Sequence, residues 1–120
     1  MLVLDTHVVI HAFAGELTAR ERAALSRDSW SISAISLWEL AKLVSLGRVE
    51  LDLEDADVVR ALARLYVWPI TREISRRSTD LDFHGDPADE LIAATSLVHG
   101  APLATRDRAI RRSRQVLFAW

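Results

Sequence analysis

Cysteine is absent from this 120-residue chain, and lysine occurs only once, as Lys42. The absence of cysteine excludes a disulfide framework, thiolate metal sites and cysteine nucleophiles, and it fits a reducing cytoplasm. No stretch approaches the roughly 18 apolar residues that a membrane span requires. The first apolar run ends at Asp5 and has no basic segment before it, so we expect neither a signal peptide nor a membrane association.

The charge balance gives no overall attraction to nucleic acid, because the formal net charge is −2. Five arginines nevertheless crowd one segment: Arg106, Arg108, Arg111, Arg112 and Arg114. The planar guanidinium suits phosphate contact, whereas an arginine-rich helix can also be a solvated face, and the sequence leaves both interpretations open. With 50% hydrophobic and 27% charged residues, the composition is typical of a globular chain, and we predict a single domain over residues 1–120.

Short apolar segments alternate with longer helical segments, which is the pattern of βαβ units. Pro69 cannot donate to a sheet ladder, so its strand is expected at or near an edge. Strands joined through helices imply parallel pairing with right-handed crossovers, and the prediction is an α/β fold, a three-layer α/β/α sandwich. The expected strands are residues 2–4, 30–33, 67–70, 102–105 and 116–120. The expected helices are residues 7–14, 17–28, 36–47, 55–66, 71–81, 86–100 and 107–114.

Four acids are associated with the strands of this expected sheet. Asp5 ends the first strand, and Glu39 comes one turn into the helix after the second. Asp107 follows the fourth strand, and Asp89 opens the helix that leads into that strand. Since functional groups gather outside the carboxyl ends of parallel strands, we expect all four acids at the same edge. An unpaired charge in an apolar interior is very costly, and a shared acidic pocket explains the carboxylate that interrupts the first apolar run.

The acids near helix starts also have purely structural interpretations. Glu39 stands three residues after Ser36 and can serve as a capping-box glutamate. Asp89 stands three residues after Asp86, which is itself a natural N-cap, and Asp107 can cap the last helix. Acids in the first turn also complement the helix dipole with no chemistry implied. The sequence leaves these roles open beside the chemical ones.

The expected gathering of four acids at one edge of the sheet favours a metal site. Carboxylates within ~4 Å repel by about 4 kcal/mol at an effective dielectric of 20. Three or four of them in one cleft would oppose folding unless some are protonated or a cation lies between them. Oxygen ligands without cysteine or a histidine pair favour Mg²⁺ or Mn²⁺. Such ions activate water for attack on phosphate, so the hypothesis is metal-assisted phosphodiester hydrolysis.

Five stretches together match one known family in order and spacing. They are VLDTH (3–7), SISAISLWELAKLVSLGRVEL (31–51), DFHGDPADELIAATSL (82–97), LATRDRAI (103–110) and VLFAW (116–120). Each stretch is a weak signal alone, but the set spans nearly the whole chain. With them the chain resembles the PIN-domain ribonuclease toxins of the VapC type, the toxin halves of VapBC toxin–antitoxin pairs. The resemblance implies a five-stranded parallel sheet and a Mg²⁺- or Mn²⁺-dependent endoribonuclease.

The resemblance also implies roles for individual residues. Asp5, Asp89 and Asp107 would hold the metal directly or through water. Glu39 would help to position the metal and the water. The polar residues that the resemblance places beside this set are Thr6, Thr105 and Asp86.

The histidines carry less information than the acids. His7, His11 and His99 lie within or at the ends of expected helices, where packing or exposure explains them, whereas His84 could line the cleft. His7 stands where many relatives carry asparagine. The segment DPADE (86–90) stands where many near relatives read DPFDR, a change that can alter the cleft mouth or the RNA contacts. Neither departure touches the four acids.

The resemblance implies partners as well as an activity. RNA would be the substrate, a small VapB-type antitoxin would dock an arm along the toxin, and the toxin would form a homodimer. The apolar residues at 37–46 and the helix at 55–66 are candidate surfaces for these contacts. We expect the antitoxin to block the acidic cleft with a basic side chain.

Other functional classes fit the sequence less well. A receiver domain needs an acidic pair after its first strand and a lysine after its fifth, whereas Asp5 stands alone and Lys42 lies in an expected helix. Its third strand must end in an aspartate, but VWPI (67–70) ends without an acid. A DxD phosphohydrolase lacks its second acid here, because Thr6 and His7 follow the first. The remaining alternative is a PIN scaffold that acts as an interaction module without turnover.

Overall fold

A computed structural model describes all of residues 1–120. Its four strands are β1 (Leu2–Leu4), β2 (Trp30–Ser33), β3 (Tyr66–Trp68) and β4 (Leu103–Ala104). Its seven helices are α1 (Thr6–Ala14), α2 (Ala19–Leu25), α3 (Ala34–Ser45), α4 (Ala56–Ala63), α5 (Arg72–Arg77), α6 (Pro87–His99) and α7 (Arg108–Arg111). None of these helices is both long and apolar enough to cross a membrane.

All four strands pair in parallel, in the order β3-β2-β1-β4. β3 is an edge strand, as expected from the proline in its segment. The expected fifth strand at residues 116–120 is reduced to one isolated bridge between Phe118 and Leu103. The N–H of Leu103 donates to the carbonyl of Leu117 at 2.8 Å, and its carbonyl accepts from Ala119 at 3.0 Å. The segment therefore runs beside β4, but β4 is only two residues long and supports no longer ladder.

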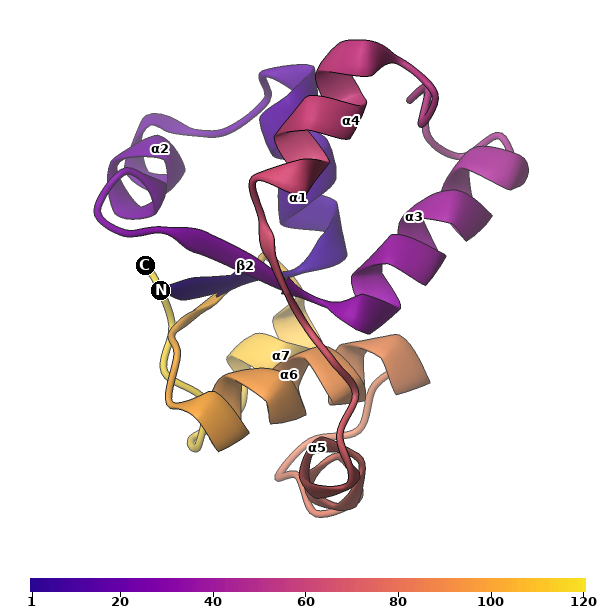
Figure 1. Ribbon diagram of the computed structural model, residues 1–120. Helices are drawn as coiled ribbons and strands as arrows, with labels where there is room; N and C mark the ends of the chain where they lie inside the picture. Colours follow the sequence, from indigo (N-terminus) through magenta and orange to yellow (C-terminus); the bar gives the residue numbers. More distant parts are fainter.

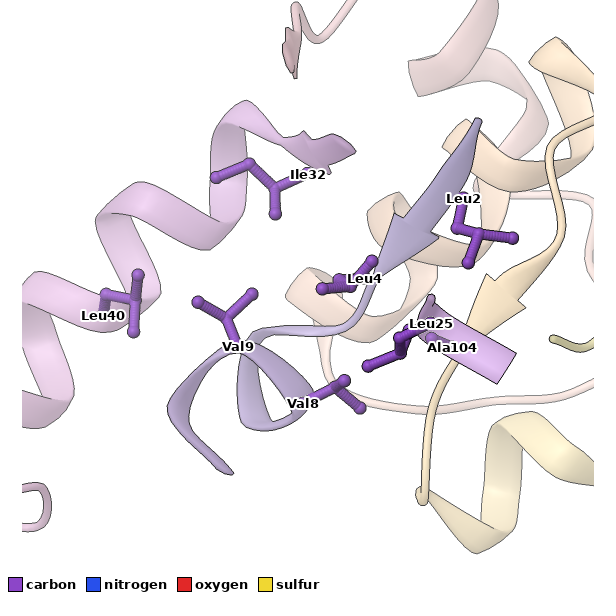
Figure 2. Packing of buried hydrophobic residues seen from close by; sticks show 8 residues of the cluster. All are labelled: Leu2, Leu4, Val8, Val9, Leu25, Ile32, Leu40 and Ala104. Carbon is purple, nitrogen blue, oxygen red and sulfur yellow. The ribbon is translucent and has the colours of Figure 1, made fainter. Parts of the chain in front are cut away.

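Figure 1 shows α1 to α4 on one side of the sheet and α5 to α7 on the other. Alternation of side chains along β1 explains this arrangement, because successive residues point to opposite faces. Leu2 and Leu4 join one apolar core, and Val3 joins another together with Ile92 of α6 and Ile110 of α7. The first core, drawn in Figure 2, consists of Leu2, Leu4, Val8, Val9, Leu25, Ile32, Leu40 and Ala104. The predicted three-layer α/β/α sandwich is confirmed.

Side-chain caps fix several helix starts where the sequence predicts them. Thr18 and Glu21, which stand three residues apart, form a reciprocal capping box at the start of α2. The Thr71 hydroxyl accepts a bond of 3.2 Å from the N–H of Ile74 in α5. The predicted start of α3 at Ser36 is wrong by two residues, because the hydroxyl of Ser33 already caps the helix. Four predicted helix ends are three or four residues too late, since α2 stops at residue 25, α4 at residue 63, α5 at residue 77 and α7 at residue 111.

Candidate functional site

The residues that follow β1, β2 and β4 meet the start of α6 at one cleft of about 360 Å³, and no hydrophobic side chain lines it. The lining residues are Asp5, His7, His11, Glu39, Asp86, Asp89, Arg106 and Asp107. All four acids predicted to share a sheet edge are therefore brought together, and Asp86 lies with them. Because parallel strands present their carboxyl ends on one side, acids that are distant in sequence meet here.

A larger hollow of about 460 Å³ lies beside α1 and α4. Apolar side chains form most of its wall, among them Phe13, Trp30 and Leu65. Of its two charged residues, Asp28 is already bound to the N-terminal ammonium group, and Arg64 forms no ion pair. This hollow has no set of groups suited to acid–base or metal chemistry. The acidic cleft is therefore the candidate site, although it is smaller.

Asp5 is buried at the point where β1 ends, with 3% of its surface exposed. It occupies the N-cap position of α1, yet its side chain caps no helix N–H. Instead, Oδ2 accepts a hydrogen bond of 2.7 Å from the Thr105 hydroxyl, while Oδ1 is buried without a hydrogen-bond partner. Burial raises the pKa of this carboxyl, and the bond from Thr105 is the main opposing effect. The carboxylate that interrupts the apolar run serves the cleft and not the helix end.

Thr105 connects the first acid with the last. Its hydroxyl is fully buried, donates to Asp5 and accepts a bond of 3.0 Å from the backbone N–H of Asp107. Asp107 in turn caps α7, because its Oδ1 accepts from the N–H of Ile110 at 3.0 Å. The helix-capping role considered for Asp107 is therefore correct, and the same side chain also lines the cleft.

Glu39 lies in the second turn of α3 and has no role at its start. Since Ser33 is the N-cap, the alternative interpretation of Glu39 as a capping-box partner of Ser36 is wrong. The Oε1 atom of Glu39 is instead buried without a hydrogen-bond partner. One turn before it, the Ser36 hydroxyl accepts a bond of 2.9 Å from the Thr6 hydroxyl. This contact joins α3 to α1, the helix that directly follows Asp5.

Asp86 and Asp89 stand at the start of α6. Asp86 is the N-cap residue, as predicted, but its side chain makes no capping hydrogen bond and lines the cleft instead. Burial, followed by the negative charges of its neighbours, raises the pKa of Asp89 to about 7. Those neighbours are Asp5, Asp107, Glu39 and Asp86. The acids are thus close enough to disfavour one another's ionisation.

Two buried oxygens make the cleft suitable for a cation. Oδ1 of Asp5 and Oε1 of Glu39 have no donor from the protein, although buried polar atoms are nearly always paired. An all-oxygen donor set of this kind suits a hard ion such as Mg²⁺ or Mn²⁺. No three acidic or histidine side chains converge closely enough to enclose an ion by themselves. An ion held here would keep part of its water shell, as Mg²⁺ commonly does in proteins.

Three basic side chains share the cleft with the acids: His7, His11 and Arg106. The sequence did not assign them to it, although His7 and His11 lie one turn apart on the helix that follows the first acid. Arg106 directly precedes the last acid, but its orientation depends on a partner far away in the sequence. The candidate His84 does not line the cleft.

The chain is similar to known proteins both in sequence and in fold. The PIN domain profile matches residues 2–115. The chain is 34% identical over 119 residues to Ribonuclease VapC22 of Mycobacterium tuberculosis (strain ATCC 25618 / H37Rv), across 94% of this chain and 92% of that protein. A toxin–antitoxin complex from Klebsiella pneumoniae has a similar fold, with a TM-score of 0.74, 22% identity and coverage of 100% and 98% of the two chains. VapBC2 from Rickettsia felis, bound to a promoter DNA fragment, gives a TM-score of 0.72, 17% identity and coverage of 98% and 96%.

Proposed function

Because this chain belongs to the PIN domain family, we propose that it is a divalent-metal-dependent endoribonuclease and the toxin of a type II toxin–antitoxin pair. The observation that carries the proposal is the meeting of acids from separate elements in one cleft: Asp5, Glu39, Asp89 and Asp107. The relative that aligns over nearly the whole chain is named a ribonuclease. The proposed reaction is hydrolysis of RNA phosphodiester bonds.

In the proposed mechanism, the cleft acids would hold Mg²⁺ or Mn²⁺. Asp5, Asp89 and Asp107 would bind the ion directly or through water, and Glu39 would position ion and water. When bound, such an ion polarises phosphate oxygens and lowers the pKa of a coordinated water molecule. The unpaired Oδ1 of Asp5 and Oε1 of Glu39 support these roles, because both atoms are available to an ion or to its water. Thr105 fixes the other oxygen of Asp5 and so sets the direction of the free one.

The partners follow from the same proposal. Solved structures with this fold include toxin–antitoxin complexes, and we propose that a VapB-type antitoxin and a second copy of this chain bind here too. Exposed apolar side chains on α3 and α4 support these surfaces: Leu37 and Trp38 are 40% and 56% exposed, and Val59 is 50% exposed. A basic antitoxin side chain in the acidic cleft would inhibit the enzyme, whose RNA substrate fits the expected cytoplasmic location.

RNA cleavage by the purified protein tests the proposal. A structured RNA is incubated with the protein in Mg²⁺, in Mn²⁺ and in excess EDTA. We expect cleavage with either metal, none with EDTA and recovery when metal is added back in excess. Cleavage should coincide with the protein peak in gel filtration, which separates it from contaminating ribonucleases. No cleavage of any RNA by the folded, metal-supplied protein would favour the interaction module without turnover.

Replacing Thr105 by valine is expected to lower RNA cleavage by about 10- to 100-fold, the usual cost of losing a group that orients a metal ligand. Valine matches threonine in shape but leaves Oδ2 of Asp5 and the N–H of Asp107 without their bonds. Cleavage rates under saturating metal measure the effect. Thr105→Ser keeps the hydroxyl and should retain most of the activity. Equal rates for the valine and serine variants would show that this hydroxyl does not orient Asp5.

A further inference from the structure

Arg106 is the one permanently charged cation in the wall of the acidic cleft. The other bases of the cleft are His7 and His11, and an imidazole, unlike a guanidinium, is not a permanent cation. RNA carries a negative charge at each phosphate, so the cleft acids repel any phosphate that no cation faces. A metal ion offsets this repulsion only where it binds. Arg106 is therefore the side chain suited to a phosphate elsewhere in the cleft.

The Arg106 guanidinium is held in one orientation by two protein groups. Nε donates to Oε2 of Glu21 at 2.7 Å, and Nη2 donates to Oε1 of Glu21 at 2.7 Å. Nη2 also donates to the carbonyl of Glu16 at 3.0 Å. The third nitrogen, Nη1, makes no hydrogen bond within the protein, and the side chain is 35% exposed. The two N–H groups of Nη1 are thus free to donate to a ligand, and Arg106 lines the cleft.

Glu21 is an unusually firm anchor for this arginine. Its side chain is only 6% exposed, and it also accepts a bond of 2.8 Å from the N–H of Thr18 in the capping box of α2. The bond from Arg106 is the main reason why the pKa of Glu21 is lowered to about 2. The pair therefore remains ionised throughout the neutral range. A guanidinium fixed by a bidentate carboxylate presents its remaining donors with little loss of side-chain entropy.

The other arginines of the 106–114 segment are placed differently. Arg111 donates to the carbonyls of Thr105 and Trp120 and lies over the Phe118 ring, so its role is structural. Arg108, Arg112 and Arg114 are exposed and form no ion pair. None of these four lines the cleft. Of the five arginines in this segment, only Arg106 is therefore placed to contact a phosphate in the cleft.

We propose that Arg106 binds a phosphate of the RNA in the cleft through Nη1, and that Glu21 is a positioning residue that aims the guanidinium. This inference rests on the proposed ribonuclease function. The competing role is a structural latch, in which Arg106 only ties the 16–21 segment to the loop after β4. A latch affects the stability of the protein, whereas a phosphate contact affects RNA affinity and its dependence on salt.

The test uses the full chain and a fluorescein-labelled single-stranded oligouridine, with Ca²⁺ in place of Mg²⁺ and a gel to verify that the RNA stays intact. Fluorescence anisotropy gives Kd at several salt concentrations for the wild type and for Arg106→Gln, Arg106→Lys and Glu21→Gln. The matched control is Arg20→Gln, which removes the same charge from an exposed position on α2 outside the cleft. Thermal melts report the stability of every variant.

Arg106→Gln is expected to weaken RNA binding about tenfold, the effect of one lost charge-assisted hydrogen bond. The slope of log K against log salt should fall by about 0.7, the value for one phosphate contact with a single strand. Arg106→Lys should keep the slope and recover part of the affinity, and Arg20→Gln should change neither. Glu21→Gln should weaken affinity severalfold with an unchanged slope, because the charge stays while its position is lost.

If folded Arg106→Gln binds RNA with an affinity within twofold of wild type and with an unchanged salt slope, the proposal is overturned and only the structural latch remains. If Glu21→Gln fails to fold, the comparison of Arg106→Gln with Arg106→Lys still decides. Failure of the phosphate contact is distinguishable from failure of the ribonuclease function. Absence of metal-dependent cleavage contradicts the ribonuclease function, whereas cleavage together with a normal Arg106→Gln variant contradicts only the phosphate contact.

Discussion

Replacing Asp5 by asparagine is expected to lower RNA cleavage at least about 1,000-fold, a loss of roughly 4 kcal/mol of transition-state stabilisation. Asparagine has nearly the same size, and its amide oxygen can still accept the bond from Thr105, so the fold should persist. The variant lacks the negative charge that gives a carboxylate its affinity for a divalent ion. Cleavage rates in Mg²⁺ and in Mn²⁺ measure the effect, and circular dichroism verifies the fold.

The matched control for this variant is Asp57→Asn. It removes an equally charged carboxylate from the surface of α4, where the side chain is 85% exposed and paired only with Arg60. Its cleavage rate should stay within twofold of wild type, because exposed pairs of this kind contribute little. A folded Asp5→Asn protein that cleaves RNA as fast as this control would remove the central residue from the proposed site. The binding-only alternative would then be favoured.

The second large effect is expected for Asp89→Asn, which should weaken catalysis and stabilise the metal-free protein. The pKa of Asp89 rises from an ordinary value of 3.8 to about 7 in the folded state. Between these two values the folded protein holds a proton that the unfolded chain has released. The free energy of unfolding therefore decreases as pH rises through this window and levels off above it. The raised pKa of Asp5 likewise makes the free energy of unfolding decrease as pH rises.

Asparagine at position 89 removes most of this pH dependence. Because the side chain is partly exposed, solvent screening reduces the expected gain at pH 8 to about 1–2 kcal/mol, or roughly 5 °C in Tm. Cleavage should fall about 100-fold or more, since a charged group of the proposed site is lost. Melting curves in EDTA from pH 4 to 8 for wild type and variant measure the stability. Parallel curves for the two proteins would contradict the repulsion between the acids.

Adding Mg²⁺ or Mn²⁺ provides an internal comparison for the same variant. The ion should raise the Tm of the wild type more at pH 8 than at pH 5, because protons and metal compete for the same carboxylates. The increase should be smaller for Asp89→Asn at every pH. A metal effect of equal size in both proteins would place the ion away from Asp89.

The position of the acids could be predicted because it depends on topology. A short apolar strand followed by an acid, repeated in a βαβ chain, places Asp5 and Asp107 at the same sheet edge whatever the details of packing. The sequence alone could not show whether Glu39 caps a helix or lines the acidic cleft, because its role depends on the residue at which α3 begins. The hydroxyl of Ser33, rather than that of Ser36, caps the helix, and Glu39 is thereby left free for the cleft.

The contacts that orient the site were less predictable. The pairing of Arg106 with Glu21 joins residues 85 positions apart, and Glu21 already had a sufficient explanation as a capping-box residue. A side chain that has a satisfactory local role gives no sign of a second, distant one. The fifth strand was overestimated for a related reason. The apolar pattern of residues 116–120 is that of a strand, but the length of its neighbour β4 limits the pairing.

The shortness of β1 has a consequence for how this chain tolerates mutation. Leu2, Val3 and Leu4 are all buried, they belong to two different cores, and Asp5 follows without an intervening residue. A survey of random substitutions would therefore find residues 2–5 as one uninterrupted intolerant block. Within that block, lost folding and lost chemistry would give the same phenotype in a selection for activity. A parallel measurement of protein abundance would separate these two causes. Asp5 should then be the one position in the block whose substitution leaves the protein abundant but inactive.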